Sequence, residues 1–308
     1  MFARLRERVI AVWRRWWALI VAVALILCFI SEQTGLTDRL LVLCGVADPH
    51  LPPKDGELQV HTLDVGNADA LVLFCDGKTM LIDAGEHNDG DNVTEYLQHL
   101  GVTHLTYVIA THADADHIGG MREVLENFTV GEYLMATMPY GAEPTTATYW
   151  NLLSFLEERQ IKVTETKPGM ERRLGGAVVE ILAPVVESED SNEQSVVCMV
   201  NYGDTRFLFM GDAGESVEGY LFSEDLHADF LKVSHHGAEN ATGENFLRRV
   251  SPTVAVISCG RNNPYGHPAA AVLSRLEQVG ASVYRTDRDG HIVVTSDGKT
   301  LQVTTETE

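Results

Sequence analysis

The sequence predicts an α+β fold built from two mixed β-sheets with helices on their outer faces. From residue 58 onward, short apolar runs typical of strands alternate with amphipathic segments typical of helices. The first strands are joined by tight turns, which favours mixed rather than purely parallel sheets. The candidate metal-binding residues follow the ends of apolar runs, where sheets of this kind present their chemistry.

The elements before the middle of the chain have clear boundaries. Strand-like runs occupy 58–63, 70–75, 79–82 and 105–110, and helical patterns occupy 92–100 and 120–128. The Asp76-Gly77 dipeptide predicts a hairpin turn, and Gly101 ends the first helix. The stretch 130–184 is less readable, apart from an amphipathic helix over 148–160.

The second half of the region repeats the alternation of strands and helices. Strands are expected over 195–200, 206–210, 230–234, 253–258, around Val283, and over 292–295 and 301–305. Helices are expected over 215–222, 245–250 and 269–279. The Gly203-Asp204 dipeptide predicts the turn between the first two of these strands.

The N-terminus carries a candidate membrane segment. Residues 16–30 hold no charge, and the tract is short for a spanning helix of about 20 residues and long for a signal-peptide core. Flanking tryptophans and arginines extend the span, so we expect an uncleaved anchor over 1–31 and a linker over 32–57. The domain over 58–308 then lies outside the membrane. A cleaved signal peptide, which would release a secreted protein, and a buried core helix stay open as alternatives.

The charge balance argues against one class of partner. The chain of 308 residues has 23 Lys and Arg against 44 Asp and Glu, a net charge of −21. Five of the arginines lie in the first 17 residues, so the rest of the chain is more acidic still. Such a surface repels polyanions at long range, and tight nonspecific nucleic-acid binding is not expected.

The motif HADADH, residues 112–117, is the most informative stretch of the chain. It places His112, Asp114, Asp116 and His117 in a loop between a buried strand and a helix. In an extended segment His112 and Asp114 point the same way, while Asp116 and His117 turn toward a second point. One loop can thus supply ligands to two metal ions. A polar turn with a helix cap is the alternative, but one aspartate would suffice for it.

Other candidate site residues also follow apolar strands. Asp212 comes after Gly211 at a strand end and suits a carboxylate that bridges two cations, while His235 and His236 precede Gly237. Asp83 is placed to orient a metal-binding histidine through its second ring nitrogen. His267, before Pro268 and a helix, suits a metal ligand, a proton donor, a substrate contact or a helix cap.

The chain resembles the metallo-β-lactamase superfamily and, more narrowly, the extracytoplasmic domain of ComEC-type competence proteins in a stand-alone form. The resemblance is carried in family order by LDVGNADA (63–70), LIDAG (81–85), THADADHIGG (111–120), Gly211-Asp212, LKVSHHG (231–237) and NNPYGHP (262–268). It covers roughly residues 58–295 and implies an αββα sandwich with the metal site at one edge of the two sheets.

The resemblance also implies the roles of individual residues. His112 and Asp114 hold one divalent ion, the group Asp116, His117 and His235 or His236 holds the other, Asp212 bridges, and Asp83 supports. The family usually has histidine where this chain has Asp114, which makes the site richer in oxygen and suits Zn²⁺ or Mn²⁺. The histidine of the usual third motif is absent, and Ser195 or Asn192 stands near its position.

These residues predict a metal-dependent hydrolase that uses a metal-activated water. Asp116 is the expected proton acceptor, and His267 protonates the leaving group or holds the oxyanion. The expected substrate is a phosphodiester, whether small, attached to the cell wall or part of a nucleic acid. A lactone, β-lactam or thioester hydrolase and a non-catalytic surface-binding module on the same fold stay open as alternatives.

Overall fold

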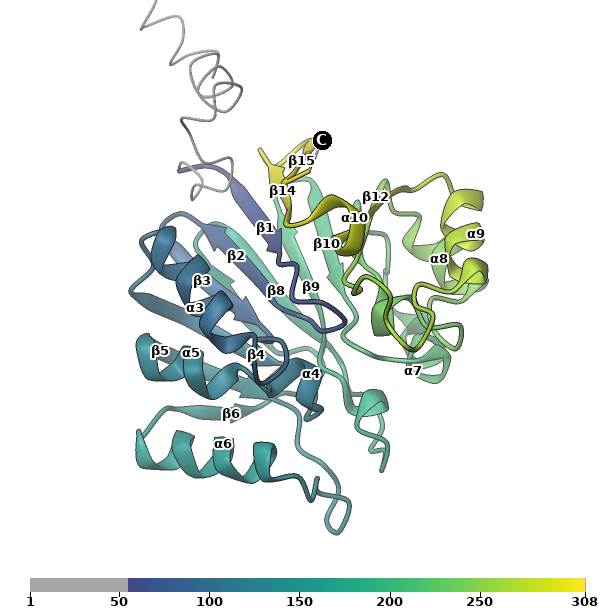
Figure 1. Cartoon of the computed structure of the whole chain (residues 1–308). Coiled ribbons are helices and arrows are strands. Elements are labelled where there is room, and N and C mark those ends of the chain that lie inside the picture. The colour runs from purple at the N-terminus through teal and green to yellow at the C-terminus, as the bar shows by residue number, and fades with distance from the viewer. Residues whose placement is uncertain (1–54, 308) are drawn as a thin grey trace, which may run out of the picture. The chain divides into compact units, whose positions relative to one another are not determined.

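A computed structural model describes residues 55–307 of the chain (Figure 1). The predicted anchor over 1–31 lies outside the described residues, as does most of the predicted linker over 32–57, and both stay predictions. Within the described residues, none of the helices combines the length and apolar character needed to cross a bilayer.

Two mixed β-sheets form the centre of the domain, as the sequence predicts. The eight-stranded sheet has the order β15-β14-β1-β2-β3-β4-β5-β6, and the seven-stranded sheet has the order β13-β12-β11-β10-β9-β8-β7. The first sheet comprises β1 (Leu58–Thr62), β2 (Leu71–Cys75), β3 (Lys78–Ile82), β4 (His104–Ala110), β5 (Thr129–Met135), β6 (Val163–Glu165), β14 (Ile292–Ser296) and β15 (Leu301–Thr305). The second comprises β7 (Glu171–Leu174), β8 (Ala177–Ala183), β9 (Val197–Tyr202), β10 (Thr205–Phe209), β11 (Phe230–Lys232), β12 (Val254–Ile257) and β13 (Ser282–Arg285).

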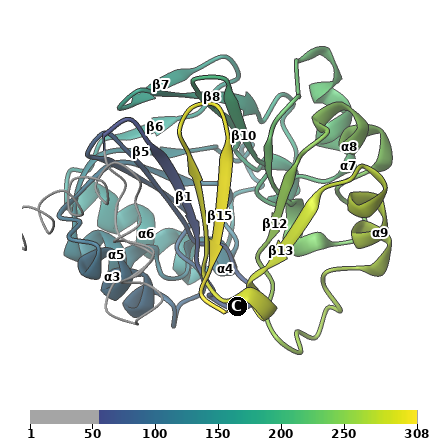
Figure 2. The same cartoon turned by 90° about the horizontal axis from the view of Figure 1, so that it is seen from above.

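The helices lie in two outer layers. Figure 2 shows α3, α5 and α6 beside the first sheet and α7, α8 and α9 beside the second, with the sheets between them. The α-helices are α3 (Gly90–His99), α4 (Ala115–Ile118), α5 (Met121–Asn127), α6 (Ala147–Glu158), α7 (Glu215–Tyr220), α8 (Glu244–Val250), α9 (Ala270–Gln278) and α10 (Thr286–Asp289). Short 3₁₀ turns are η1 (Asn192–Gln194), η2 (Leu221–Ser223) and η3 (Ser234–Gly237).

Three hydrophobic layers hold these elements together. One lies between the two sheets, and each of the others lies between one sheet and its helices. Successive side chains of strand β11 point to opposite faces of its sheet, so Phe230 packs between the two sheets and Leu231 packs toward the helices. The four layers of secondary structure thus enclose a continuous core.

The structure differs from the sequence analysis mainly in the middle of the chain. Residues 130–184 contain β5 to β8, which complete one side of each sheet, where the sequence analysis expected only a helix. Gly131 and the buried Glu132 interrupt the apolar pattern of β5, and β6 has only three residues. Glu132 is nevertheless satisfied, since Arg172, Lys162 and Thr164 all contact its carboxylate.

Parallel pairing sets the position of the candidate site. Strands β3, β4 and β5 pair in parallel, as do β10, β11 and β12. The carboxyl ends of parallel strands meet at one edge of a sheet, so the loops that follow β4, β10 and β11 emerge where the two sheets adjoin. These loops carry the HADADH motif, Asp212 and the paired histidines.

An ion pair buried between the two sheets links one sheet to the other near these loops. The Nζ atom of Lys232, at the end of β11, lies 2.8 Å from Oδ2 of Asp69, and both side chains are 1% exposed. Lys232 points to the same side of β11 as Phe230, toward the other sheet. Its amine also donates to the carbonyl of Val233. The pair fixes the 63–70 turn of the first sheet against the second.

We predict that Lys232→Met lowers the free energy of unfolding by about 3–5 kcal/mol, because it leaves the Asp69 carboxylate buried without a counter-charge. Urea titration followed by circular dichroism measures the change. The double variant Lys232→Met/Asp69→Asn removes the stranded charge and is expected to recover most of the loss. A single variant as stable as the wild type, or a double variant less stable than the single one, contradicts this account.

A second buried acid makes stability depend on pH. Glu218 in α7 is 2% exposed, and burial raises the pKa of its carboxyl to about 7. The backbone N–H groups of Thr242 and Gly243 donate to its two oxygens and partly offset that effect. The folded chain therefore holds a proton here that the unfolded chain, with an ordinary glutamate pKa near 4.5, releases.

The sign of the effect follows from linkage. A carboxyl whose pKa is raised by folding contributes stability that is complete below pH 4.5 and lost as the pH rises through about 7. We predict that the unfolding free energy of the wild type, relative to Glu218→Gln, falls by about 3 kcal/mol across this interval. Denaturation of both proteins between these pH values tests it, and parallel pH profiles would refute it.

Candidate metal centre

The loop after β4 places two histidines side by side. Strand β4 ends at Ala110 and α4 begins at Ala115, so the HADADH motif turns sharply between them. The rings of His112 and His117 lie 4.0 Å apart between centroids, and both side chains are buried. The Asp114 and Asp116 side chains of the same motif remain 46% and 30% exposed. The motif therefore offers buried nitrogens and more accessible oxygens at one place.

Asp83 orients His117 from behind. Its Oδ2 atom accepts a hydrogen bond from Nδ1 of His117 at 2.8 Å, while the backbone N–H and hydroxyl of Thr111 donate to the same carboxylate. A φ of +58° at Asp83 turns the carboxylate inward from the end of β3. The bond leaves Nε2 of His117 as the atom directed into the site, as the sequence analysis expects of Asp83.

Asp212 enters the site from the end of β10. Its backbone N–H donates to the hydroxyl of Ser195 at 3.1 Å. A side chain at the preceding Gly211, where φ is +54°, would come within 3.0 Å of Thr111 and 3.1 Å of Ser195. Glycine is therefore required for this loop to approach the others so closely. Ser195 holds the backbone of Asp212 from this side, and its hydroxyl is engaged there.

The paired histidines enter from the end of β11 and differ in exposure. Both have positive φ values, +50° for His235 and +53° for His236, so their rings point in different directions. His236 is buried, and its Nδ1 donates to the carbonyl of Ser258 at 3.1 Å. The His235 side chain is 23% exposed. Nε2 of His236 is thereby presented to the site.

Four of these side chains bring potential ligand atoms close enough together to bind a single ion. Potential ligand atoms of Asp116, His117, Asp212 and His236 all lie within 4.8 Å of one another. Nε2 of His117 is 3.4 Å from Oδ1 of Asp212, and Nε2 of His236 is 3.4 Å from Oδ2 of Asp116. Two nitrogens and two oxygens at such distances suit a tetrahedral divalent cation.

A second, looser group shares Asp212. Nε2 of His112 lies 3.9 Å from Oδ2 of Asp114 and 3.9 Å from Oδ2 of Asp212. His235 approaches the same Asp212 oxygen to 3.7 Å. The hydroxyl of Ser191 donates to the other oxygen of Asp114 at 2.6 Å and fixes its orientation. Asp212 thus lies between the two groups, in the place of a bridging ligand.

The hydrogen bonding around these atoms tests whether a cation fits. Within residues 55–307, Nε2 of His112, His117 and His236 and Oδ1 of Asp212 are buried without hydrogen-bond partners. Buried polar atoms are almost always paired, so a cluster of unpaired lone-pair donors fits a bound cation. A second possible cluster of Asp69, Asp83 and His117 fits less well. Its carboxylates are already engaged by Lys232, Thr111 and His117.

Proton affinities at the site reflect the crowding of acids and imidazoles. Burial opposes a charge on His117, yet the carboxylates of Asp212 and Asp83 raise its pKa well above its usual range. Burial would raise the pKa of Asp212, but His117 and His236 hold it well below its usual range. The pKa of His112 is lowered, first by burial and then by the neighbouring His117. In the metal-free protein, protonated imidazoles thus balance the buried acid, and a cation would replace those protons.

A cleft of about 470 Å³ opens onto these residues. Its lining includes Asp116, Asp212, His235, His236 and His267, together with Asn67, Glu86 and Asn192. Burial and the nearby His235 and His236 lower the pKa of His267, so its ring is neutral near pH 7. Such a ring presents an N–H to an oxyanion more readily than it supplies a proton.

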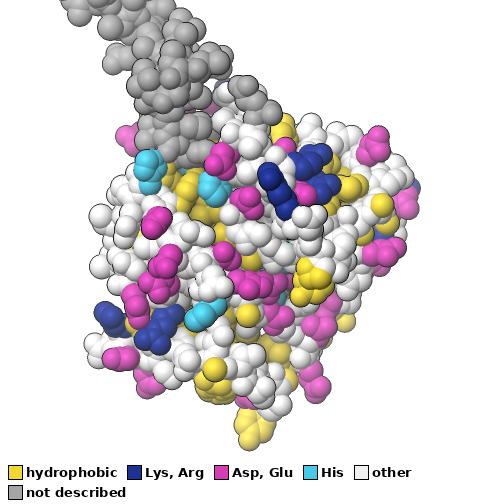
Figure 3. All heavy atoms as spheres, in the orientation of Figure 1, with side chains coloured by type: hydrophobic (Ala, Val, Ile, Leu, Met, Phe, Trp, Pro, Cys, Tyr) yellow, Lys and Arg dark blue, Asp and Glu magenta, His cyan; other side chains and the backbone are white. Residues whose placement is uncertain are grey.

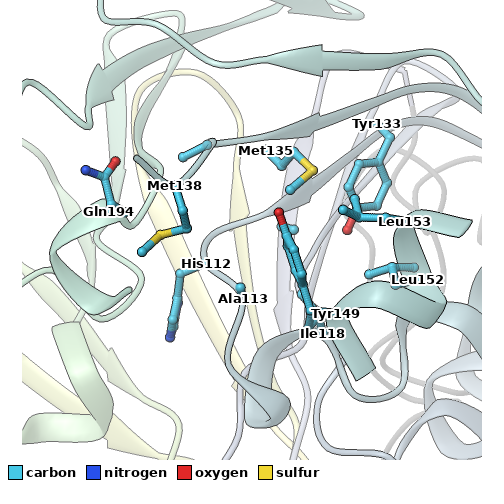
Figure 4. Close-up of a pocket in the computed structure, with 12 residues that line it drawn as sticks. His112, Ala113, Ile118, Tyr133, Met135, Met138, Tyr149, Leu152, Leu153 and Gln194 are labelled. Atoms are coloured by element: carbon cyan, nitrogen blue, oxygen red, sulfur yellow. The ribbon is translucent and has the colours of Figure 1, made fainter. Parts of the chain in front are cut away.

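His112 also lines a second, mostly apolar cavity. Figure 4 shows His112 and Gln194 at one end, with Met135, Met138 and Tyr149 around the space beyond. The cavity has a volume of about 20 Å³, room for about one water molecule. This cavity is therefore too small to admit a substrate.

The structure brings together all the residues that the sequence analysis named, in two shells. His112, Asp114, Asp116, His117, Asp212, His235 and His236 surround the centre, His267 lines the cleft, and Asp83 and Ser195 contact the inner residues from behind. The Lys232–Asp69 pair and the cleft residue Glu86 were not predicted from the sequence. A lysine inside the apolar run of β11 was a signal for that pair.

Comparisons with known proteins place this arrangement in a family. The model of the metallo-beta-lactamase superfamily matches residues 63–261. ComE operon protein 3 of Bacillus subtilis is 28% identical over 88% of this chain and 38% of its own length. Recombination protein 2 of Haemophilus influenzae is 32% identical over 77% of this chain and 28% of its own. The chain therefore spans less than two fifths of the length of these relatives.

Solved structures with the same fold are more distant in sequence. The metallo-beta-lactamase fold protein YhfI from Bacillus subtilis superposes with a TM-score of 0.51 at 13% identity, over 79% of this chain and all of that one. CmlA, a diiron beta-hydroxylase from Streptomyces venezuelae, gives 0.51 at 13% identity over 80% of this chain and 57% of that one. These likenesses agree with the observed fold, and the family model covers more than half of the sequence. The chain belongs to the metallo-beta-lactamase superfamily and is a metallo-hydrolase.

Proposed function

We propose that this protein is a metal-dependent phosphodiesterase of the competence-protein type. The observation that carries the proposal is that three buried histidine nitrogens and Oδ1 of Asp212, without hydrogen-bond partners among the described residues, lie together, and that His236 and Asp212 among them line a cleft. Divalent cations held by these residues would supply Lewis acidity, which lowers the pKa of water toward neutrality and polarises a phosphoryl oxygen. In the reaction the water oxygen would bond to phosphorus and one P–O ester bond would break, releasing an alcohol that takes up one proton of the water.

The residues present would hold two ions. His117, His236, Asp116 and Asp212 would bind the first, and His112, Asp114 and Asp212 the second, with His235 at its edge. Asp114 and the shared Asp212 make the second group rich in oxygen, which suits Mn²⁺ or a Zn²⁺ site of hard character. Asp83 and the Ser258 carbonyl keep the two histidines of the first group in the required tautomer.

Two residues at the cleft would handle protons and charge. Asp116 faces the cleft, and although burial opposes ionisation, His236 and His117 lower the pKa of its carboxyl. It is therefore ionised near neutral pH and available as a proton acceptor. His267, which also lines the cleft, would direct its ring N–H toward the oxygen on which charge develops.

Three considerations favour a phosphodiester over a lactone or β-lactam. The chain lacks the third-motif histidine of classical members, and Ser195, near that position, is engaged by the Asp212 backbone. The remaining metal ligands are rich in oxygen and therefore suit a hard cation, and a hard cation binds phosphoryl oxygens well. Two relatives are named for recombination and competence, which points to nucleic acid. An extracytoplasmic location on a single N-terminal anchor remains part of the proposal, on the sequence evidence of residues 1–31.

We predict that the metal-free chain takes up two Zn²⁺ or Mn²⁺ ions per molecule, and that Asp212→Asn takes up at most one tightly. Dialysis against each metal followed by elemental analysis measures the stoichiometry. Uptake weakens between pH 7.5 and 5.5, because the cations must displace protons from His117 and His236. Asp225→Asn changes an exposed aspartate paired with Arg206 and serves as the matched control. Equal uptake by both variants contradicts the assignment.

The activity itself is tested with bis(p-nitrophenyl) phosphate and nitrocefin. The metal-loaded chain is expected to hydrolyse the phosphodiester and to leave the β-lactam intact. Asp212→Asn should lower kcat/KM by at least about a hundredfold, whereas Asp225→Asn should keep the wild-type rate. Turnover of nitrocefin alone would favour the lactamase alternative. Loss of both activities with stoichiometric metal present would remove the phosphodiesterase proposal.

A further inference from the structure

A row of rings leads from the metal centre to the protein surface. The ring centroids of His236 and His235 are 6.3 Å apart, those of His235 and His267 5.9 Å, and those of His267 and Tyr265 5.7 Å. The last pair is stacked, with an angle of 26° between the planes. Tyr265 is 69% exposed and lines the cleft, so one face of its ring is open to a ligand.

The loop that carries Tyr265 is held in one conformation by its own side chains. The amide nitrogen of Asn263 donates to the carbonyls of Gly260 and His267, and its amide oxygen accepts from the N–H of His267. Gly260 lies against the Gly66–Asn67 turn, where a Cβ would come within 2.9 Å of the Asn67 nitrogen. An exposed aromatic ring on a fixed loop loses little entropy when a ligand stacks on it.

The same loop begins with an exposed cation. Nε of Arg261 donates to the backbone carbonyl of Asp287 at 2.7 Å, and no carboxylate of residues 55–307 lies within ion-pair distance of its guanidinium. The neighbouring Arg285 is neutralised by Asp287, with which it makes two hydrogen bonds. Figure 3 shows the resulting group of basic side chains over α10, beside acidic ones. In a chain of net charge −21, an exposed cation at the start of the loop whose Pro264, Tyr265 and His267 line the cleft is suited to contact an anion.

We propose that residues 261–267 form a binding platform for single-stranded nucleic acid next to the scissile phosphodiester. A base stacks on Tyr265, and Arg261 contacts a phosphate further along the strand. An aromatic ring combined with a cation is the usual means by which proteins bind single strands without reading sequence. The inference rests on the proposed phosphodiesterase function and names its substrate class. The acidic remainder of the surface limits the contact to a short segment.

Fluorescence anisotropy tests the platform with the full-length chain and Mn²⁺. The probes are a labelled short oligothymidylate with phosphorothioate linkages, which resist cleavage, and an abasic strand of the same length and linkage. We expect the base-bearing strand to bind about fivefold or more tightly than the abasic one. Tyr265→Ala should abolish that difference, and Tyr265→Phe, which keeps the ring, should retain it. Comparing the two strands cancels any contribution from the N-terminal arginines.

The cation is tested by salt dependence. Arg261→Gln should reduce the slope of log K against log salt concentration by about 0.7, the value for one phosphate contact on a single strand. Arg248→Gln, on the exposed face of α8 and paired with Glu244, is the matched control and should leave the slope unchanged. Equal slopes for both variants, or equal binding of base-bearing and abasic strands by the wild type, would overturn the platform.

The two proposals fail in different ways. Hydrolysis of bis(p-nitrophenyl) phosphate together with base-independent binding leaves the phosphodiesterase in place and removes the platform. Base-dependent binding that is lost in Tyr265→Ala, in a chain that hydrolyses no phosphodiester, supports the platform and removes the proposed reaction.

Discussion

The central constraint on this molecule is that three imidazole nitrogens and a carboxylate oxygen are buried together with no protein partner among the described residues. Each such atom would cost about 1–3 kcal/mol if it stayed unsatisfied. Their surroundings nevertheless hold them in place: Asp83 binds the back of His117, the Ser258 carbonyl binds the back of His236, and Ser195 holds the backbone of Asp212. Lone pairs that are held in place around Asp212 without protein partners are explained by divalent cations bound there.

The fold supplies the rigidity that this arrangement needs. Parallel pairing of β3–β5 and of β10–β12 brings the ends of these strands to one edge, and the layer between the sheets fixes their separation. The Lys232–Asp69 pair ties the two sheets together directly beneath the site. Glycine at position 211 lets the Asp212 loop approach Thr111, because a Cβ there would come within 3.0 Å of the Thr111 side chain. The geometry of the metal site at the edge of the sheets therefore depends on the packing between the two sheets.

Much of this could be read from the sequence where chemistry and periodicity coincide. Two sheets, most of the helices and the HADADH cluster follow from apolar runs that end in metal-binding residues. Strand β5 was missed because Glu132 and Gly131 break its apolar pattern, and the salt bridges that allow Glu132 to be buried come from distant residues. The sequence left His235 and His236 equivalent, because the buried ring is distinguished from the more exposed one by a tertiary contact, the bond from Nδ1 of His236 to the Ser258 carbonyl. Lys232 stood out as a lysine inside an apolar run, but its partner Asp69 is 163 residues away in the sequence and could not be named from it.

Anomalous X-ray scattering from crystals of the chain loaded with Mn²⁺ or Zn²⁺ tests the central claim most directly. The account predicts a strong peak enclosed by Asp116, His117, Asp212 and His236, and a second beside His112 and Asp114 with Asp212 between them. Crystals of the loaded protein that show no peak within ligand distance of Asp212, or in which the metal lies elsewhere, would contradict it.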